Sequence, residues 1–188
     1  AYRKRVNETF GLIYPLIVLG GRTGCRKTLI LHEIKKLGQQ VIDLEGLVNH
    51  QGSTFGSKGI LVQPSQEQFE NNFASALSVL DIQQPIWVEN ESVVIGRIVI
   101  PKPFFLQITQ AKVIDIQKPF EERVKFLVEE YGHLDHPFLE EALIKISKRL
   151  GPMQTKEALI ALSENRMDDF IIWALQYYDK QYDKSKLK

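Results

Sequence analysis

The 188-residue chain has a single cysteine, Cys25, so it can form no internal disulfide bond. A reducing compartment is the default for such a chain, and we expect a cytoplasmic protein. Long apolar runs are absent as well: the stretch 171–175 is far shorter than the roughly 18 residues that a membrane helix needs. The N-terminal segment also lacks an apolar stretch of the kind found in signal peptides. We therefore expect neither a disulfide-stapled secreted domain nor a membrane protein.

A dominant charge of one sign is missing too. The chain carries 24 basic and 23 acidic side chains, which gives a net charge of +1. Attraction of the whole molecule to nucleic acid or membrane is then weak, and any such binding must come from a local basic patch. With 44% apolar and 25% charged residues, the composition is that of a soluble globular protein and excludes a disordered chain.

Short apolar strands alternate with helices through the first two thirds of the chain. Strands are predicted at 16–19, 41–44, 86–88 and 113–116, and helices at 1–10, 27–37, 66–80 and 103–111. The glycine-rich stretch 46–64 indicates a long functional loop. Further helices are predicted at 120–131, 137–150, 155–163 and 167–182. This order predicts an α/β fold, a P-loop NTPase-like parallel sheet flanked by helices with an all-helical C-terminal part. We expect the α/β domain to span 1–131 and the helical extension packed on it to span 132–188.

The clearest functional signal is a glycine-rich turn that follows an apolar strand and opens a helix. Its sequence is Gly20-Gly21-Arg22-Thr23-Gly24-Cys25-Arg26-Lys27-Thr28. Such a turn aims backbone N–H groups at a phosphate, whose charge Lys27 would neutralise, while the Thr28 hydroxyl would bind Mg²⁺. Arg26 stands where the P-loop pattern has glycine, and it would either obstruct the phosphate or add a contact to it. The alternatives are an ordinary strand–turn–helix connection and a loop that has lost nucleotide binding.

Acidic residues follow two of the predicted strands: Asp43 and Glu45 after the second, Glu89 and Glu91 after the third. Open α/β sheets bind ligands at the carboxyl ends of their strands, although each acid alone is equally well a solvated loop residue. Glu89 is the best candidate to hold Mg²⁺ together with Thr28. The candidate catalytic residues are Lys27, Glu89 and Asp43.

Two further sets of candidate residues complete the predicted site. The phosphate-binding set is Gly21, Arg22, Thr23, Gly24, Cys25, Arg26, Lys27, Thr28 and Arg97. The substrate-loop set, which would close over a substrate unless it is only a flexible surface loop, is Glu45, Asn49, His50, Gly52 and Ser53. Arg123, near the start of a predicted helix, is either a phosphate ligand or half of a local ion pair.

Five segments together carry a family resemblance: Gly20-Gly21-x-Thr23-Gly24-x-x-Lys27-Thr28; Asp43-Leu44-Glu45-Gly46-Leu47-x-Asn49-His50-x-Gly52-Ser53-x-Phe55-Gly56; Pro64-Ser65-Gln66-x-x-Phe69-Glu70-Asn71; Trp87-Val88-Glu89-x-Glu91-Ser92 with Ile95-Gly96; and Glu122-Arg123-Val124 leading to Glu130-Tyr131. They resemble the C-terminal P-loop domain of tRNA 2-selenouridine synthase. The second segment is the most specific, because generic P-loop proteins do not share it. Arg26 departs from the family's usual P-loop glycine.

The resemblance implies a transferase that converts 2-thiouridine at the wobble position of tRNA to 2-selenouridine. It implies selenophosphate as selenium donor and an S-geranylated intermediate made from geranyl diphosphate, with ATP or GTP as further candidate ligands. The implied partners are the tRNA anticodon region and the family's rhodanese-like domain, whose catalytic cysteine Cys25 does not match. Two alternatives stay open: a small-molecule kinase or NTPase with Arg123 as transition-state arginine, and a non-catalytic tRNA-docking module.

Overall fold

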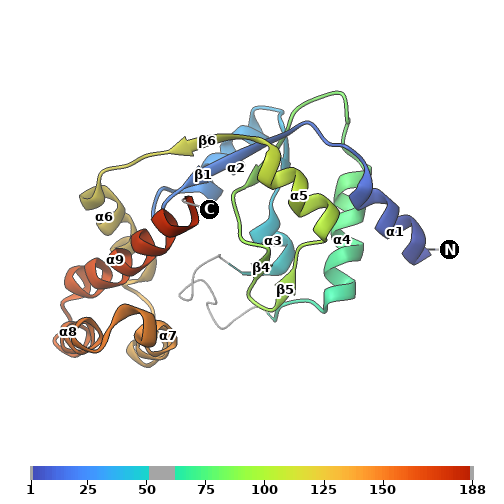
Figure 1. The fold of residues 1–188 in the computed structure, drawn as a ribbon. Coiled ribbons are helices and arrows are strands. Elements are labelled where there is room, and N and C mark those ends of the chain that lie inside the picture. Colours follow the sequence, from blue (N-terminus) through green and yellow to red (C-terminus); the bar gives the residue numbers. More distant parts are fainter. Residues whose placement is uncertain (1, 51–61, 187–188) are drawn as a thin grey trace. The chain divides into compact units, whose positions relative to one another are not determined.

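The computed structural model describes residues 2–50 and 62–186, and it confirms the predicted alternation of strands and helices. Strand β1 (Leu16–Gly21) is apolar at its first four positions, as suits a strand buried on both faces of a parallel sheet. It pairs in parallel with β3 (Ile86–Glu89) on one side and with β6 (Lys112–Ile116) on the other. Strand β2 (Gln40–Ile42) pairs in parallel with β3, so the sheet order is β2-β3-β1-β6. Figure 1 shows β6 beside β1.

One apolar core lies between the sheet and three helices, α1 (Tyr2–Gly11), α4 (Gln66–Ser78) and α5 (Lys102–Gln110). Each of these helices contributes a phenylalanine: the ring centroid of Phe73 lies 5.3 Å from that of Phe10 and 4.8 Å from that of Phe104. Helix α2 (Lys27–Lys36) contacts β1, β2 and β3, and buries Leu31 outside this cluster. The turn that opens α2 is thereby anchored to the central strand at its start and to a sheet-packed helix at its end.

A second apolar core joins four helices: α6 (Phe120–Tyr131), α7 (His136–Leu150), α8 (Pro152–Ser163) and α9 (Met167–Lys186). Contacts divide the described residues into two compact units, one of 2–21, 26–50 and 62–116, and the other of 22–25 and 117–186. The sequence predicts a boundary after residue 131, whereas α6 belongs to the helical unit because Val124, Leu127 and Tyr131 are buried in its core. None of the helices in the described ranges is long and apolar enough to cross a membrane.

Short elements replace parts of the predicted loop and strand ends. The predicted strand 41–44 is wrong at its end, because Asp43 caps helix α3 (Leu44–Val48) by accepting a 2.7 Å hydrogen bond from the Gly46 N–H. Strands β4 (Val94–Ile95) and β5 (Ile98–Val99) form a hairpin that turns at Gly96, where φ is 60°. Helix α9 also runs past residue 182. The rest of the predicted loop, 51–61, lies outside the described residues.

Candidate functional site

The glycine-rich turn between β1 and α2 bends through two left-handed backbone positions. Gly24 has a φ of 84°, and a Cβ there would lie 3.0 Å from Cβ of Arg123. Arg26, the residue before α2, has φ 61° and ψ 34°, a conformation that costs an L-residue roughly 1–2 kcal/mol. Glycine would adopt it freely, which gives a physical reason for the glycine of the P-loop pattern. The chain keeps the turn with arginine there, at the expense of backbone strain.

Lys27 and Thr28 form the first turn of α2. The Lys27 Nζ donates to the Gly21 carbonyl oxygen at 3.0 Å, so its ammonium folds back over the turn. The Thr28 hydroxyl donates to Oε2 of Glu45, also at 3.0 Å. Lys27 is predicted to contact phosphate and Thr28 to bind Mg²⁺. In this structure they donate hydrogen bonds to a carbonyl oxygen and a carboxylate oxygen of the protein itself.

The carboxylates predicted at the strand ends do come together. Glu89 is fully buried: its Oε2 accepts a 2.9 Å hydrogen bond from the Leu44 N–H. Its Oε1 is buried and has no hydrogen-bond partner among the residues that the structure describes. Burial, with the charge of Asp43 adding to it, raises the pKa of Glu89 well above its ordinary value. An unsatisfied buried carboxylate oxygen calls for a partner that the described residues do not supply.

Glu45 and Glu91 share a hydrogen bond in which protonated Glu91 is the donor. Burial raises the pKa of both carboxyl groups, that of Glu91 to about 7, with the charge of Glu45 as the second cause. The charge of the Lys27 ammonium acts in the opposite direction and lowers the pKa of each. The first turn of α2 thus faces more carboxyl groups than one ammonium can balance once they ionise.

These oxygens fit a Mg²⁺ ion that binds together with a phosphate. Mg²⁺ prefers oxygen ligands and is usually held by one or two carboxylates, with substrate phosphates and waters completing its shell. The Thr28 hydroxyl, the Glu45 carboxylate and the free oxygen of Glu89 are donors of this kind. Within 2–50 and 62–186, no three His, Cys, Asp or Glu side chains are arranged to hold a metal by themselves. A metal here would accordingly depend on ligands from a phosphate.

Other predicted residues have structural partners of their own. Asp43, besides capping α3, lies 3.3 Å from Nε2 of His32. Asn49 ends α3 with φ 53° and donates from Nδ2 to the Val62 carbonyl oxygen at 3.2 Å. His50 is half-buried, and burial lowers its pKa. Gly52 and Ser53 lie outside the described residues.

Arg97 lies in the β4–β5 turn and points to backbone oxygens. Its guanidinium donates to the carbonyl oxygens of Gln63 and, at 3.4 Å, Pro64, while its N–H donates to the Gln63 side chain at 3.0 Å. The structure therefore shows a tie between the hairpin and the segment before α4. A phosphate contact by Arg97 stays a prediction.

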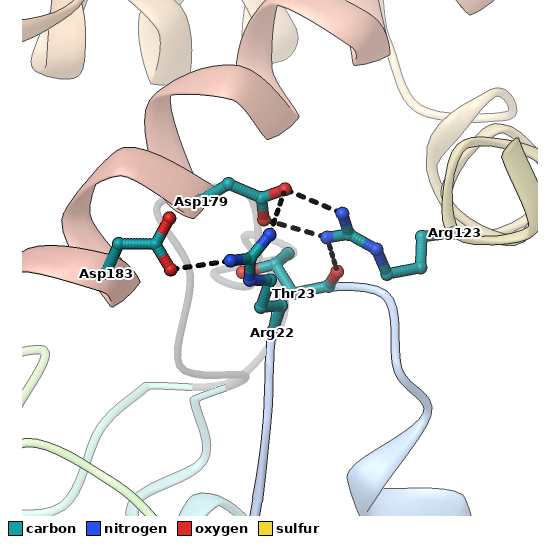
Figure 2. Close-up of polar contacts among 5 residues, drawn as sticks. All are labelled: Arg22, Thr23, Arg123, Asp179 and Asp183. Carbon is teal, nitrogen blue, oxygen red and sulfur yellow. Dashed lines mark hydrogen bonds and ion pairs between the residues drawn. The ribbon is translucent and has the colours of Figure 1, made fainter. Parts of the chain in front are cut away.

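The tip of the glycine-rich turn, residues 22–25, belongs to the helical unit and contacts α6 and α9 through charged side chains. Arg123, only 3% exposed, donates from both Nη atoms to Asp179, at 2.8 and 2.6 Å, and from Nη1 to the Thr23 carbonyl oxygen at 3.1 Å. Arg22 donates to Asp183 at 2.6 Å and lies 3.5 Å from Asp179. Figure 2 shows the two guanidinium groups converging on Asp179 beside Thr23. Arg123 is thus half of an ion pair, but the partner is on α9 and not local.

Asp179 and Asp183 are the residues of this region that sequence reasoning missed. The predicted helix 167–182 includes Asp179, and the chain beyond it has the composition of a frayed, solvated end. The two aspartates lie four residues apart, a spacing that places both side chains on one face of α9. That spacing is the one sequence signal for this pair of aspartates, and it does not identify Arg123 and Arg22 as their partners.

The chain is similar to known proteins over most of its length. The chain matches the family described as the tRNA 2-selenouridine synthase AAA domain over residues 14–188. It is 35% identical over 190 residues to a tRNA 2-selenouridine synthase of Shewanella frigidimarina, covering 91% of this chain and 48% of that protein. It is 35% identical over 189 residues to one of Hydrogenovibrio crunogenus, covering 88% and 51% respectively. The chain thus spans about half the length of the curated relatives it matches. No solved structure matches it.

Proposed function

The chain belongs to the tRNA 2-selenouridine synthase AAA domain family, and on that basis we propose that it is the phosphate-binding domain of a cytoplasmic tRNA-modifying transferase. The proposed reaction converts wobble 2-thiouridine to 2-selenouridine through an S-geranylated intermediate. Geranyl diphosphate and selenophosphate are the proposed phosphate-bearing substrates, and the anticodon region of tRNA is the acceptor. The family's rhodanese-like domain would supply the catalytic cysteine.

The observation that carries this proposal is the surplus of buried carboxylate beside Lys27 and Thr28. A site for a bare phosphate needs positive charge alone. A site for a magnesium diphosphate needs an ammonium for the phosphate and carboxylate or hydroxyl oxygens for the metal. Lys27, Thr28 and the orphan oxygen of Glu89 supply both kinds of group.

Geranyl transfer forms a bond between the sulfur of 2-thiouridine and C1 of the geranyl group, and it breaks the bond from C1 to the diphosphate oxygen. The N3 proton of 2-thiouridine is released to solvent, so that the S-geranylated base is neutral. The diphosphate leaves with the electron pair, so negative charge grows on its oxygens. Lys27 would leave the Gly21 carbonyl and donate to these oxygens, together with N–H groups of the turn. Mg²⁺, when bound, supplies further charge neutralisation on the diphosphate, held by Thr28 with Glu45 or Glu89.

Isothermal titration with geranyl diphosphate, selenophosphate, ATP and GTP, each with and without Mg²⁺, tests the proposal. We expect geranyl diphosphate to bind in the presence of Mg²⁺ and Lys27→Ala to weaken it by about tenfold or more, as loss of a charge-assisted hydrogen bond implies. The matched control is Lys35→Ala, an exposed lysine of the same helix, which should leave the affinity unchanged. Equal affinity of Lys27→Ala and wild type for every ligand would refute the proposal.

The two alternatives have distinct signatures in the same experiment. A kinase would bind ATP tightly and phosphorylate a small molecule, but Asp179 engages both Nη atoms of Arg123, which weighs against a free transition-state arginine. A non-catalytic docking module would bind tRNA while none of the phosphate ligands gives a signal. Arg26→Gly, measured in parallel, would then show whether the arginine itself prevents phosphate binding.

A further inference from the structure

Arg123 touches the tip of the glycine-rich turn in two ways. Its Nη1 donates to the Thr23 carbonyl oxygen, and its Cβ packs so close to Gly24 that a Cβ there would lie only 3.0 Å from it. The guanidinium is fixed by Asp179, which accepts a hydrogen bond from each Nη atom. All of these groups belong to the helical unit, which includes residues 22–25.

A structural anchor explains these contacts better than a phosphate ligand does. Arg123 and Asp179 are 3% and 15% exposed at their side chains, so both charges are largely removed from water. If Arg123 turned to a substrate phosphate, Asp179 would stay buried with only the 3.5 Å contact to Arg22. The Thr23 carbonyl would lose its donor at the same time.

We propose that the buried Arg123–Asp179 ion pair is a positioning device for the phosphate loop, by which α6 and α9 fix the backbone of Thr23 and Gly24. These residues precede Lys27 by only a few positions, so their conformation sets the direction of the turn's N–H groups. Arg123 and Asp179 are positioning residues and do not contact substrate. The identity of the ligand rests on the proposed function, whereas the hold on the loop tip does not.

Cys25 provides a built-in reporter of the loop tip. It is the only cysteine of the chain, follows Gly24 directly, and is 2% exposed. Its N–H donates to the Arg22 carbonyl oxygen at 3.1 Å, so it is part of the same turn. A thiol reagent reaches it only when the tip opens, and the labelling rate therefore measures how firmly the tip is held.

The decisive variant is the double substitution Arg123→Met with Asp179→Leu, which removes both charges and leaves no buried ion unpaired. We expect Cys25 in this variant to react about tenfold faster than in wild type, because the bond to Thr23 is gone. Urea denaturation checks that the variant stays folded, so that the faster labelling reports local opening. The control is Arg166→Met, which breaks exposed ion pairs with Glu164 and Asp169 in the same unit. It should label at the wild-type rate.

Arg123→Lys serves if the double variant does not fold. It keeps the charge but cannot satisfy Asp179 and Thr23 with the geometry of a guanidinium, so its labelling rate should fall between those of wild type and the double variant. Wild-type labelling rates in both Arg123 variants would overturn the proposal.

A second measurement, of ligand affinity, tests whether the hold on the loop tip affects phosphate binding. Inorganic pyrophosphate and geranyl diphosphate should bind the double variant about tenfold more weakly than wild type, although Lys27 is intact. Faster labelling with unchanged affinity for both would overturn the positioning role. If wild type binds pyrophosphate but not geranyl diphosphate, the proposed substrate is wrong. The affinities of wild type and the double variant for pyrophosphate then still test the positioning role. If wild type binds neither, the proposed function fails, while Cys25 labelling still decides whether the pair holds the tip.

Discussion

The charged side chains are balanced differently at the two ends of the glycine-rich turn. At the tip, Arg22 and Arg123 are matched by Asp179 and Asp183 in ion pairs of 2.6–3.5 Å. At the helix end, burial raises the pKa of Glu45, Glu89 and Glu91; the charge of Asp43 adds to this for Glu45 and Glu89, and the charge of Glu45 adds to it for Glu91. The Lys27 ammonium acts in the opposite direction on Glu45 and Glu91. At the tip the charges are paired two with two, although Arg123 Nε is buried without a hydrogen-bond partner among the described residues. At the helix end the carboxyl groups outnumber the one ammonium beside them.

The difference separates scaffold from ligand site. A buried charge without a partner is costly, so a region where each ion has a partner is built to stay as it is. A region with surplus carboxylate and an orphan oxygen on Glu89 becomes stable only when a cation or protons arrive. Substitutions at the tip should therefore change stability and reach binding only through the conformation of the loop, whereas substitutions at the helix end should change binding and pH dependence directly.

The largest expected effect is that of Asp179→Ala. It leaves the Arg123 guanidinium buried without the carboxylate that accepts from both its Nη atoms, and it should lower the free energy of unfolding by about 3–5 kcal/mol. Urea denaturation at neutral pH measures this. Asp169→Ala, which breaks an exposed ion pair with Arg166, should cost less than about 1 kcal/mol. A cost below that level for Asp179→Ala as well would erase the contrast between the two regions.

The next effect is a fall in stability with rising pH that originates at the helix end. Burial and the charge of Glu45 raise the pKa of Glu91 from its ordinary 4.5 to about 7, while Lys27 acts in the opposite direction. The folded protein then holds this proton where the unfolded chain has lost it. The stability it contributes is full at low pH and is lost as the pH rises through that interval, at up to about 1.4 kcal/mol per pH unit.

Glu91→Gln should reduce this slope, measured by urea denaturation without Mg²⁺ between about pH 5 and pH 8. The exposed Glu157→Gln of α8 is the control and should leave the slope as it is in wild type. If the free energy of unfolding changed with pH equally in Glu91→Gln and wild type, the helix-end carboxyl groups would not be the source of the pH dependence.

Local patterns explain why much of the helix-end region is predictable from the sequence. The apolar run before Gly20 marks a buried strand, and the first turn of the next helix places Lys27 and Thr28. The acids gather because parallel strands end at the same edge of the sheet. What the pattern misses is α3, since Asp43 ends the strand by capping a helix of only five residues, too short for a periodic signal.

The tip could not be predicted, because its partners are far apart in the sequence. Arg123 and Asp179 are separated by 56 positions, and Arg22 and Asp183 by 161. An ion pair leaves no periodicity, and neither a lone arginine nor two aspartates on one helix face identify each other. Arg97 shows the same limit: its carbonyl partners follow from the two-residue turn at Gly96, which no charge pattern indicates.

A smaller effect concerns Arg26, which lies between the two regions with a φ of 61°. Arg26→Gly removes the cost of the left-handed conformation, while the freedom of glycine in the unfolded chain offsets part of the gain. We expect Arg26→Gly to be about 0.5–1 kcal/mol more stable than Arg26→Ala, which loses the same side chain but keeps the strain. Thermal and urea unfolding measure the difference. Equal stability of the two variants would mean that the turn is not strained at this position.

The smallest effect is that of Asp183→Asn, which breaks the exposed half of the tip network. The Arg22 and Asp183 side chains are 41% and 53% exposed, and a pair so open to water stabilises a protein by less than about 1 kcal/mol, and less still at high salt. Urea denaturation at low and high ionic strength measures both properties. If Asp183→Asn lowered the free energy of unfolding nearly as much as Asp179→Ala, the four charged side chains at the tip would form one cooperative network. Arg22 would then be as fixed as Arg123, and it would have no freedom to leave Asp183 for a phosphate.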